Sequence, residues 1–410
     1  MGTKGFILIS SLGFLCSCTQ QANIPIGLDN SPVVAQRVVT TQGDTVVVAN
    51  MDLMTDTIDF PMSLLFSEFE LVKLEDKEEA LIGNETQTFV SPSYVGIYSF
   101  YTGYKLFNKK GDFITNISKK GQGPNEYPIS ILGSFIDEEN DKVYLIVPIG
   151  NAILSFDLQG NPQKHIPVAN GSINRASFRF DASKQHLYIT HLAFSEDDVS
   201  NEQLCYWEQD LQGNMIKKLK AGHLAARPDF SNELNSHMNT AAIDYAVGYC
   251  YDERVDSLYH YNQAKNRMEP VFTTNLDCIS YYHAYIELPD YYCIFRNSYF
   301  GDGWCGYALI DKHTLKGSCV RFKLDMLGNI DIPQYNMIDY GYYKTCIHPY
   351  VLQEQWMKKG DIKGLPDGIS RFVQYLQTHD CEEMNNVVLI GKLKQSKDEG
   401  FTLKDMVFKQ

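Results

Sequence analysis

A short polar turn between two alternating apolar strands recurs along this chain with a period near fifty residues. In each copy the first strand leads through Asn or Asp into a turn that is usually closed by Gly or Asn. Asn and Asp hydrogen-bond to the backbone two residues on, and Gly or Asn accepts the positive φ that closes such a turn. The pattern therefore predicts five β-hairpins in register. Their pivots are Asn108, Asp157, Asp210, Asn262 and Asp311, which are spaced by 49, 53, 52 and 49 residues.

The repeat length selects the architecture. About fifty residues hold four short strands with their loops, which is the size of one propeller blade. Long helical stripes are absent from residues 85–330, which argues against a helical repeat. Residues 330–394 hold material for a sixth copy, while the alternating segment 69–75 lacks a partner of its own. We therefore predict an all-β, six-bladed β-propeller in which this N-terminal strand pairs in the last blade and closes the ring, since closure removes open sheet edges.

One helical pattern interrupts the sixth copy. Ile369, Phe372, Val373 and Leu376 recur at the spacing of one helix face. This predicts a short amphipathic helix over about 367–378, inserted in or beside the last blade. We expect the helix to cover one end of the ring rather than to recognise a partner.

The N-terminus carries an export signal. Residues 6–15 form an apolar run that is too short to span a bilayer but suits the core of a signal peptide. The following Leu15-Cys16-Ser17-Cys18 resembles the bacterial lipobox, which implies cleavage before Cys18 and lipid attachment to it. An ordinary secretory signal or a buried N-terminal strand is the alternative.

These boundaries predict four segments and an address. The segments are a lipoprotein signal peptide (1–17), a lipidated tether and lead-in (18–59), the propeller (60–396) and a C-terminal tail (397–410). We expect the protein in the cell envelope, anchored by lipid to the outer membrane. Whether it faces the periplasm or the outside stays open.

A segment between the first two predicted blades resembles a family signature. Gly121, Gly123, Pro124, Glu126 and Tyr127 match the G-x-G-P-x-E-Y pattern of the six-bladed β-propeller lipoproteins of Gram-negative gut bacteria, which resemble NHL-repeat propellers. The resemblance covers roughly residues 60–395 and implies architecture and address but little chemistry. On its own residues, the segment reads as a connector between blades, in which the glycines permit backbone angles denied to other residues. A ligand contact is the alternative.

Charge and motifs exclude several functions. The chain has 36 Lys and Arg against 50 Asp and Glu, a net charge of −14, which makes it a poor binder of nucleic acid. It lacks HExxH, GxSxG and P-loop motifs, and its histidines lack zinc-helix spacing. Without a CxxC pair, the cysteines after Cys18 read mostly as small buried hydrophobes. We predict no cofactor, with calcium at acidic loops such as 137–139 as the alternative.

Two functions of different classes fit these observations. The first is a monomeric, lipid-anchored binding or scaffold module that holds a glycan, a peptide or an envelope protein. The second is a hydrolase or lactonase-like enzyme with a metal in the central channel, whose ligands come from several blades and are hidden in the linear sequence. We favour the first because no catalytic constellation is visible, and we assign no catalytic residue.

Overall fold

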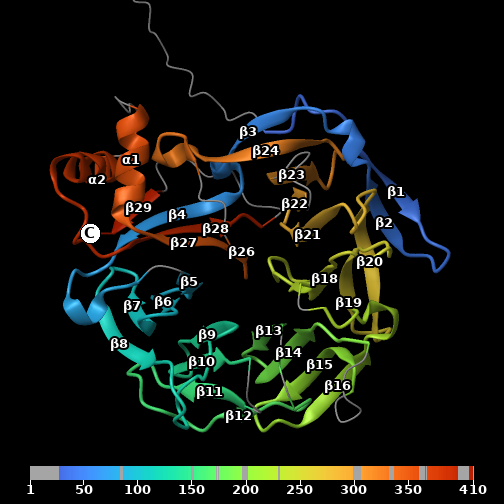
Figure 1. The fold of residues 1–410 in the computed structure, drawn as a ribbon, viewed down its shortest axis with the longest axis horizontal. Helices are drawn as coiled ribbons and strands as arrows, with labels where there is room; N and C mark the ends of the chain where they lie inside the picture. Colours follow the sequence, from blue (N-terminus) through green and yellow to red (C-terminus); the bar gives the residue numbers. More distant parts are fainter. Residues whose placement is uncertain are drawn as a thin grey trace, which may run out of the picture.

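The computed structural model describes residues 27–83, 86–148, 152–171, 173, 175–195, 202–229, 231–298, 306–331, 337–359, 365, 367–395 and 406–409. Six small sheets stand around a ring in the order of the chain (Figure 1). The predicted six-bladed β-propeller is therefore confirmed.

Blades one to three are four-stranded antiparallel sheets, with the first strand innermost (Figure 1). Blade one contains β5 (Thr86–Val90), β6 (Tyr94–Ser99), β7 (Gly103–Asn108) and β8 (Phe113–Ser118). Blade two contains β9 (Gly133–Asp137), β10 (Lys142–Ile146), β11 (Ala152–Phe156) and β12 (Ile166–Pro167). Blade three contains β13 (Ala176–Asp181), β14 (His186–His191), β15 (Leu204–Asp210) and β16 (Met215–Lys220).

Blades four to six repeat this plan and gain strands from the chain ends. Blade four contains β17 (Glu233–Asn235), β18 (Asp244–Gly248), β19 (Leu258–Asn262) and β20 (Arg267–Thr274). Blade five contains β21 (Tyr281–Glu287), β22 (Tyr291–Ser298), β23 (Gly306–Asp311), β24 (Gly317–Leu324) and β25 (Ile330–Asp331). Blade six contains β26 (Met337–Asp339), β27 (Tyr342–Ile347), β28 (Val387–Leu393), β4 (Phe66–Lys73) and β29 (Met406–Lys409).

The ring closes by pairing the two ends of the propeller. Strand β4 runs antiparallel to β28, from Val387 opposite Lys73 to Leu393 opposite Phe66. The predicted closure by an N-terminal strand in the last blade is confirmed. Without it, the unpaired backbone of β28 would present an open sheet edge.

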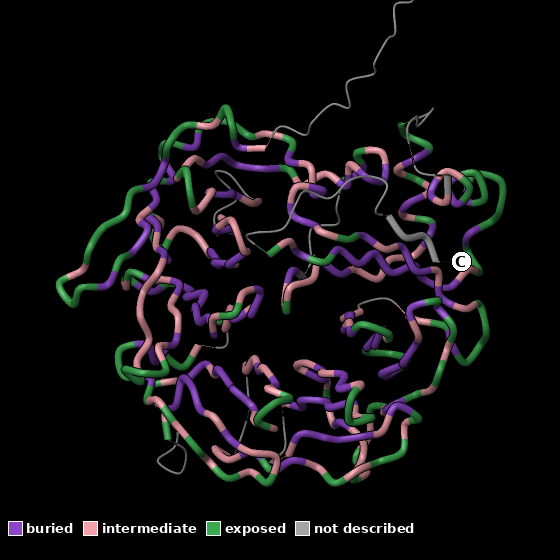
Figure 2. The backbone as a smooth tube through the Cα atoms, turned by 180° about the vertical axis from the view of Figure 1, so that it is seen from behind, coloured by how far each residue is buried: buried purple, intermediate pink, exposed green. Residues whose placement is uncertain are grey.

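The core is divided among the six blade junctions. Each of six hydrophobic clusters joins one blade to the next, and the buried strands form a continuous ring in Figure 2. Successive residues of one strand serve opposite junctions: Tyr206 packs toward blade four, whereas Trp207 packs toward blade two. Because both faces of a blade are buried in this way, no blade buries its apolar surface alone.

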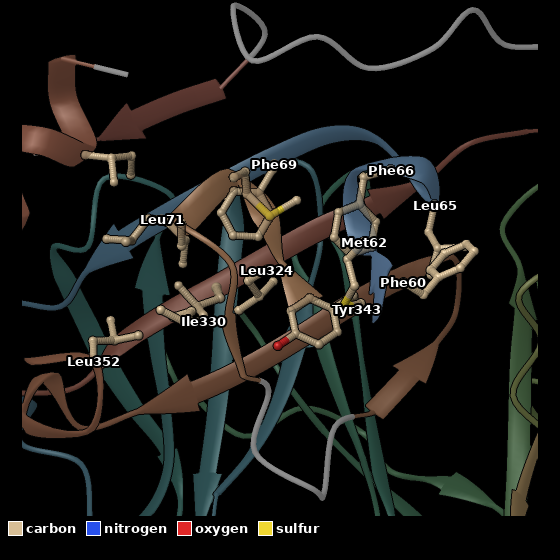
Figure 3. Packing of buried hydrophobic residues seen from close by; sticks show 14 of the residues in the cluster. Phe60, Met62, Leu65, Phe66, Phe69, Leu71, Leu324, Ile330, Tyr343 and Leu352 are labelled. Atoms are coloured by element: carbon tan, nitrogen blue, oxygen red, sulfur yellow. The ribbon is translucent and has the colours of Figure 1, made fainter. Parts of the chain in front are cut away.

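Two helices cover the outer side of the junction between blades five and six. The predicted helix is α2 (Asp367–Thr378), and a second helix, α1 (Pro349–Lys359), packs against it through Trp356 and Phe372. Both join the cluster around Phe66, Leu71, Leu324 and Tyr343, part of which is shown in Figure 3. They lie at the rim in Figure 1, so the expectation that the helix covers an end of the ring is wrong. No helix within the described residues is long and apolar enough to cross a membrane.

The segments expected as lead-in and tail contribute strands. Strands β1 (Ala35–Val39) and β2 (Thr45–Ala49) extend blade four, where β2 runs parallel to β20, and β3 (Thr57–Pro61) runs parallel to β24. The blue N-terminal chain therefore lines the outside of two blades in Figure 1. In the segment 397–410, β29 pairs in parallel with β4. The expected boundaries at 60 and 396 are thus too narrow, because these strands cover sheet edges that a propeller of 60–396 would leave open.

The turn of blade one provides a test of ring closure. Gly111, in this turn, has a φ of 94°, and a Cβ atom there would lie 1.9 Å from the carbonyl oxygen of Lys73 at the end of β4. Gly111→Ala should therefore lose about 1–2 kcal/mol for the left-handed backbone and a further ~1–3 kcal/mol for the clash. Urea unfolding of the full chain measures the loss.

Gly43→Ala is the matched control. Gly43 has a φ of 85°, but a Cβ atom at this position would have nothing within 4 Å, so the variant should show only the first of the two losses. Equal losses in the two variants would contradict the close approach of the blade-one turn to β4.

Candidate functional site

The loops of each blade emerge at two ends of the ring. Because the strands of a blade alternate in direction, the loop after the second strand and the connector to the next blade leave at the same end. At this end, a cavity of about 580 Å³ lies between blades three and four. Its walls come from the connector 221–232 and from the loop 249–257 between β18 and β19. That volume is in the range of small-molecule sites.

Arg254 ties the two walls of the cavity together. Its Nε donates to Oδ2 of Asp252 at 3.0 Å, and its Nη1 donates to the backbone carbonyls of His223 and Ala225 at 3.2 and 2.9 Å. The guanidinium lies over the ring of Tyr249, 4.5 Å from its centroid. Burial opposes the charge of Asp252, but the hydrogen bonds from Arg254 outweigh it and lower the pKa of this carboxyl. The wall is therefore held by paired charges.

Tyr245 supplies an unused polar group to the same cavity. This tyrosine lines the cavity and is fully buried, and its hydroxyl has no hydrogen-bond partner among the described residues. Burial raises its pKa well above the usual value, and the nearby Cys205 adds to this rise. Tyr249 and Tyr259, which line the cavity, also raise the pKa, whereas Arg254 lowers it. A buried hydroxyl without a partner is costly, so it marks a position where a bound molecule can contribute a hydrogen bond.

Asp256 connects the cavity to a buried polar group at the junction of blades four and five. It lines the cavity, and its carboxylate lies 3.0 Å from Nε2 of His283. The hydroxyl of Tyr285 donates to Oδ1 of Asp256 at 2.9 Å. Cys278 is also close, since ligand atoms of Asp256, Cys278 and His283 all lie within 4.8 Å of one another.

A loop of blade four contacts three other blades at the other end of the ring. This loop, residues 236–243, joins β17 to β18. The side-chain amide of Asn239 donates to the carbonyl of Glu287 in blade five and to that of Ile338 in blade six. Arg179 of blade three donates to three carbonyls of the same loop. The loop therefore links blades three, four, five and six.

The alternative function places a metal ion in the central channel, and that site stays a prediction. Within the described part of the chain, His, Cys, Asp and Glu side chains cluster in threes at one place, formed by Asp256, Cys278 and His283. That group is buried at a blade junction and not in the channel. Among the described residues, the group of potential metal ligands therefore lies beside the cavity.

The predicted Gly-Pro segment lies in the connector between blades one and two, at the same end of the ring as the cavity. Glu126 accepts from the backbone N–H of Gly123 at 2.9 Å, which lowers the pKa of its carboxyl, and Tyr127 is buried edge-on against Tyr98. A Cβ on Gly121 would meet Oε2 of Glu126 at 1.9 Å. Neither Gly121 nor Gly123 has a positive φ, so the expected role in backbone angles is wrong; the close approach of Glu126 requires Gly121 instead.

This segment also borders a second cavity. Asn125 and Glu126 line a space of about 500 Å³ between blades one and two. Pro124 lies in the turn immediately before Glu126. The side chains of this space are those of a connector packed on two blades, and the ligand contact weighed for the segment stays a prediction.

The five pivots occupy the turns between the third and fourth strands, at the end of the ring opposite the cavity. In Asp157 and Asp210 one carboxylate oxygen accepts the N–H two residues on, at 3.0 and 2.9 Å. Asn108, Asn262 and Asp311 accept local backbone N–H groups in the same way. These residues shape turns and do not meet one another. Cys18 lies outside the described residues.

Sequence reasoning missed the residues of the cavity. The available signal was the run Asp252-Glu253-Arg254 before the fourth hairpin, which places charges of both signs close to Tyr249 and Tyr251. Cys278 and His283 were read singly, as a buried hydrophobe and a scattered histidine. Six described cysteines are free thiols: Cys205, Cys278, Cys293, Cys319, Cys346 and Cys381.

Comparison with solved structures finds the same fold in one protein at low sequence identity, and more distant likenesses in two others. A putative exported protein of Bacteroides fragilis NCTC 9343 superposes with a TM-score of 0.53 at 14% identity, covering 83% of this chain and 100% of that one. A member of the DUF4221 family from Bacteroides vulgatus has a TM-score of 0.43 at 11% identity, covering 81% and 98%. A periplasmic gluconolactonase of Pseudomonas aeruginosa has a TM-score of 0.36 at 10% identity, covering 58% and 70%.

A search of curated proteins finds no match to this chain. A family model does match, and it spans residues 45–392, from β2 through β28. The matched range includes the cavity, the group around Asp256 and the edge-covering strands β2 and β3, whereas β1 and β29 lie outside it. The protein belongs to the family described as "Domain of unknown function (DUF4934)".

Proposed function

We propose that the protein is a monomeric glycan-binding module of the cell envelope, anchored to the outer membrane by lipid on Cys18. The cavity between blades three and four is its binding site. The observation that carries the proposal is the pairing of a preformed cavity of about 580 Å³ with a buried, unpartnered hydroxyl on Tyr245. A site that is already shaped and already desolvated loses little freedom when it binds.

The chemistry of the cavity favours a sugar. Sugar rings present C–H faces that pack on aromatic rings, while their hydroxyls both donate and accept hydrogen bonds. The lining offers rings in Tyr249 and Tyr259, the guanidinium of Arg254 and the carboxylates of Asp252 and Asp256. A lining with both positive and negative groups suits a neutral polar ligand. A phosphate would be repelled by the two carboxylates.

The export address supports the same role. The lipobox-like sequence ending at Cys18 and the likeness to an exported Bacteroides protein both favour the envelope. The family resemblance to lipid-anchored, NHL-like propellers agrees with this location. The proposal needs no cofactor for glycan binding and no catalytic residue.

The first prediction concerns Tyr245→Phe. It removes a hydroxyl without a protein partner, so the free energy of unfolding should not fall, while binding should lose one hydrogen bond, worth about 0.5–1.5 kcal/mol or ~2- to 12-fold in affinity. The full chain is screened on an array of neutral and acidic oligosaccharides, and the strongest hit is titrated by calorimetry against both proteins.

Tyr206→Phe is the matched control. The Tyr206 hydroxyl is also buried without a partner, but Tyr206 does not line the cavity, so this variant should bind like wild type. The proposal fails if wild type binds no oligosaccharide, or if both variants bind equally.

A second prediction tests the anchor. Cys18→Ser removes the only thiol at the predicted acylation position, so metabolic labelling with a fatty acid should be abolished and the protein should leave the membrane fraction. Cys16→Ser, two residues earlier, should keep both the label and the membrane association. Labelling of the Cys18→Ser variant would overturn the assignment of the anchor to this residue.

A further inference from the structure

Three potential metal ligands converge at the junction of blades four and five. Asp256 ends the loop between β18 and β19, Cys278 lies in the connector to blade five, and His283 is on β21. All three are buried, and their ligand atoms lie within 4.8 Å of one another. They supply one oxygen, one sulfur and one nitrogen, which is a donor set that Zn²⁺ accepts. The glycan-binding proposal uses only Asp256 of this group, as one of the carboxylates that line the cavity.

The arrangement of His283 suits a cation beside Nε2. Its Nδ1 faces the carbonyl oxygen of Tyr281 at 3.4 Å, and a neutral ring with its proton on Nδ1 donates to that oxygen. Nε2 then turns a lone pair toward the two carboxylate oxygens of Asp256, which lie 3.1 and 3.0 Å away. Two electron-rich groups at this distance repel unless a proton or a metal ion lies with them.

The negative charge of Asp256 also favours a positive charge at this position. Its side chain is 3% exposed, and its one ion-pair partner among the described residues is His283, without a lysine or arginine. A buried carboxylate of this kind is expensive without a compensating positive charge. A divalent cation would supply that charge.

The surroundings resemble the outer shell of a metal site. Ligating histidines usually donate their second ring N–H to a carbonyl, and ligating carboxylates usually accept a further hydrogen bond. Here Tyr281 provides the carbonyl for His283, and the Tyr285 hydroxyl donates to Asp256. Thr274 in turn hydrogen-bonds to the Tyr285 hydroxyl at 2.9 Å. The backbone of Cys278 is held by an antiparallel bridge to Asp252.

We propose that Asp256, Cys278 and His283 form a Zn²⁺ site whose fourth position opens toward the cavity between blades three and four. Asp256 belongs to both the group and the cavity lining, which provides the route of entry. Zinc bonds of about 2.0–2.3 Å require the three ligand atoms to draw together, by about 1 Å for the widest pair. Three protein ligands leave one position for water or for a group of a bound ligand.

The test uses the full chain with zinc or cobalt alone, so its outcome does not depend on glycan binding. After incubation with ZnCl₂ and desalting, wild type should retain about one zinc per chain by elemental mass spectrometry. Substituted Co²⁺ should show a thiolate-to-metal charge-transfer band and the intense visible bands of tetrahedral coordination. Bound zinc should also protect Cys278 from alkylation, as located by peptide mass spectrometry.

Variants assign the ligands. Cys278→Ser should lose the charge-transfer band, and Asp256→Asn, which keeps the shape of the side chain, should weaken zinc binding at least 10-fold. Cys293→Ser is the matched control, since Cys293 is a free, buried thiol of blade five outside the group, and its spectrum should equal that of wild type.

Three results would overturn the site. They are a wild-type protein without stoichiometric zinc, a cobalt spectrum without a thiolate band, and alkylation of Cys278 at the same rate with and without zinc. The alkylation measurement needs wild type alone, so it decides the question even if a variant does not fold. A zinc-free chain would leave a buried imidazolium–carboxylate pair as the account of the group.

Discussion

The burial of each blade against both of its neighbours is the interaction on which the structure depends. A sheet of four short strands cannot bury its own two faces, and each of the six hydrophobic clusters draws its side chains from two consecutive blades. Tyr206 and Trp207 illustrate the consequence, since adjacent residues of β15 serve different junctions. Such a ring is complete only when the last blade meets the first, and the pairing of β4 with β28 makes that contact.

The chain ends extend this logic to the rim of the ring. Strands β2 and β3 pair in parallel with the outermost strands of blades four and five, and β29 pairs in parallel with β4. Each addition covers a row of backbone groups that would otherwise face solvent as an open edge. The helices α1 and α2 protect the apolar side of blade six in the same region. The added strands therefore lie on blades four, five and six.

Local interactions were predictable from the sequence, and the interactions between distant segments were not. The turns at Asp157 and Asp210 are made by the residues themselves and their immediate neighbours, so composition and spacing reveal them. The helix α2 shows four apolar residues on one face, whereas α1 buries only Pro349, Leu352 and Trp356 and left no clear stripe. The parallel strand β2 pairs with residues more than two hundred positions away, which no local pattern encodes.

The candidate site depends on interactions between distant segments, so the sequence did not predict it. A strand and a loop of blade four carry Tyr245, Arg254 and Asp256. These residues form a cavity only because the connector from blade three lies opposite them. His283 acquires its significance only from Asp256, which the packing of blade five on blade four brings within 3.0 Å. Blade packing thus creates both the cavity and the group beside it, and it does so at the end of the ring where connectors and loops meet.

Native-state hydrogen exchange of the full chain tests the central claim most directly. If ring closure holds all blades in one cooperative unit, the amides of β4 open only with a free energy equal to that of β15, on a distant blade, and equal to that of global unfolding. If the amides of β4 exchange through an opening several kcal/mol cheaper while those of β15 stay protected, the ring does not depend on its closure, and the account is contradicted.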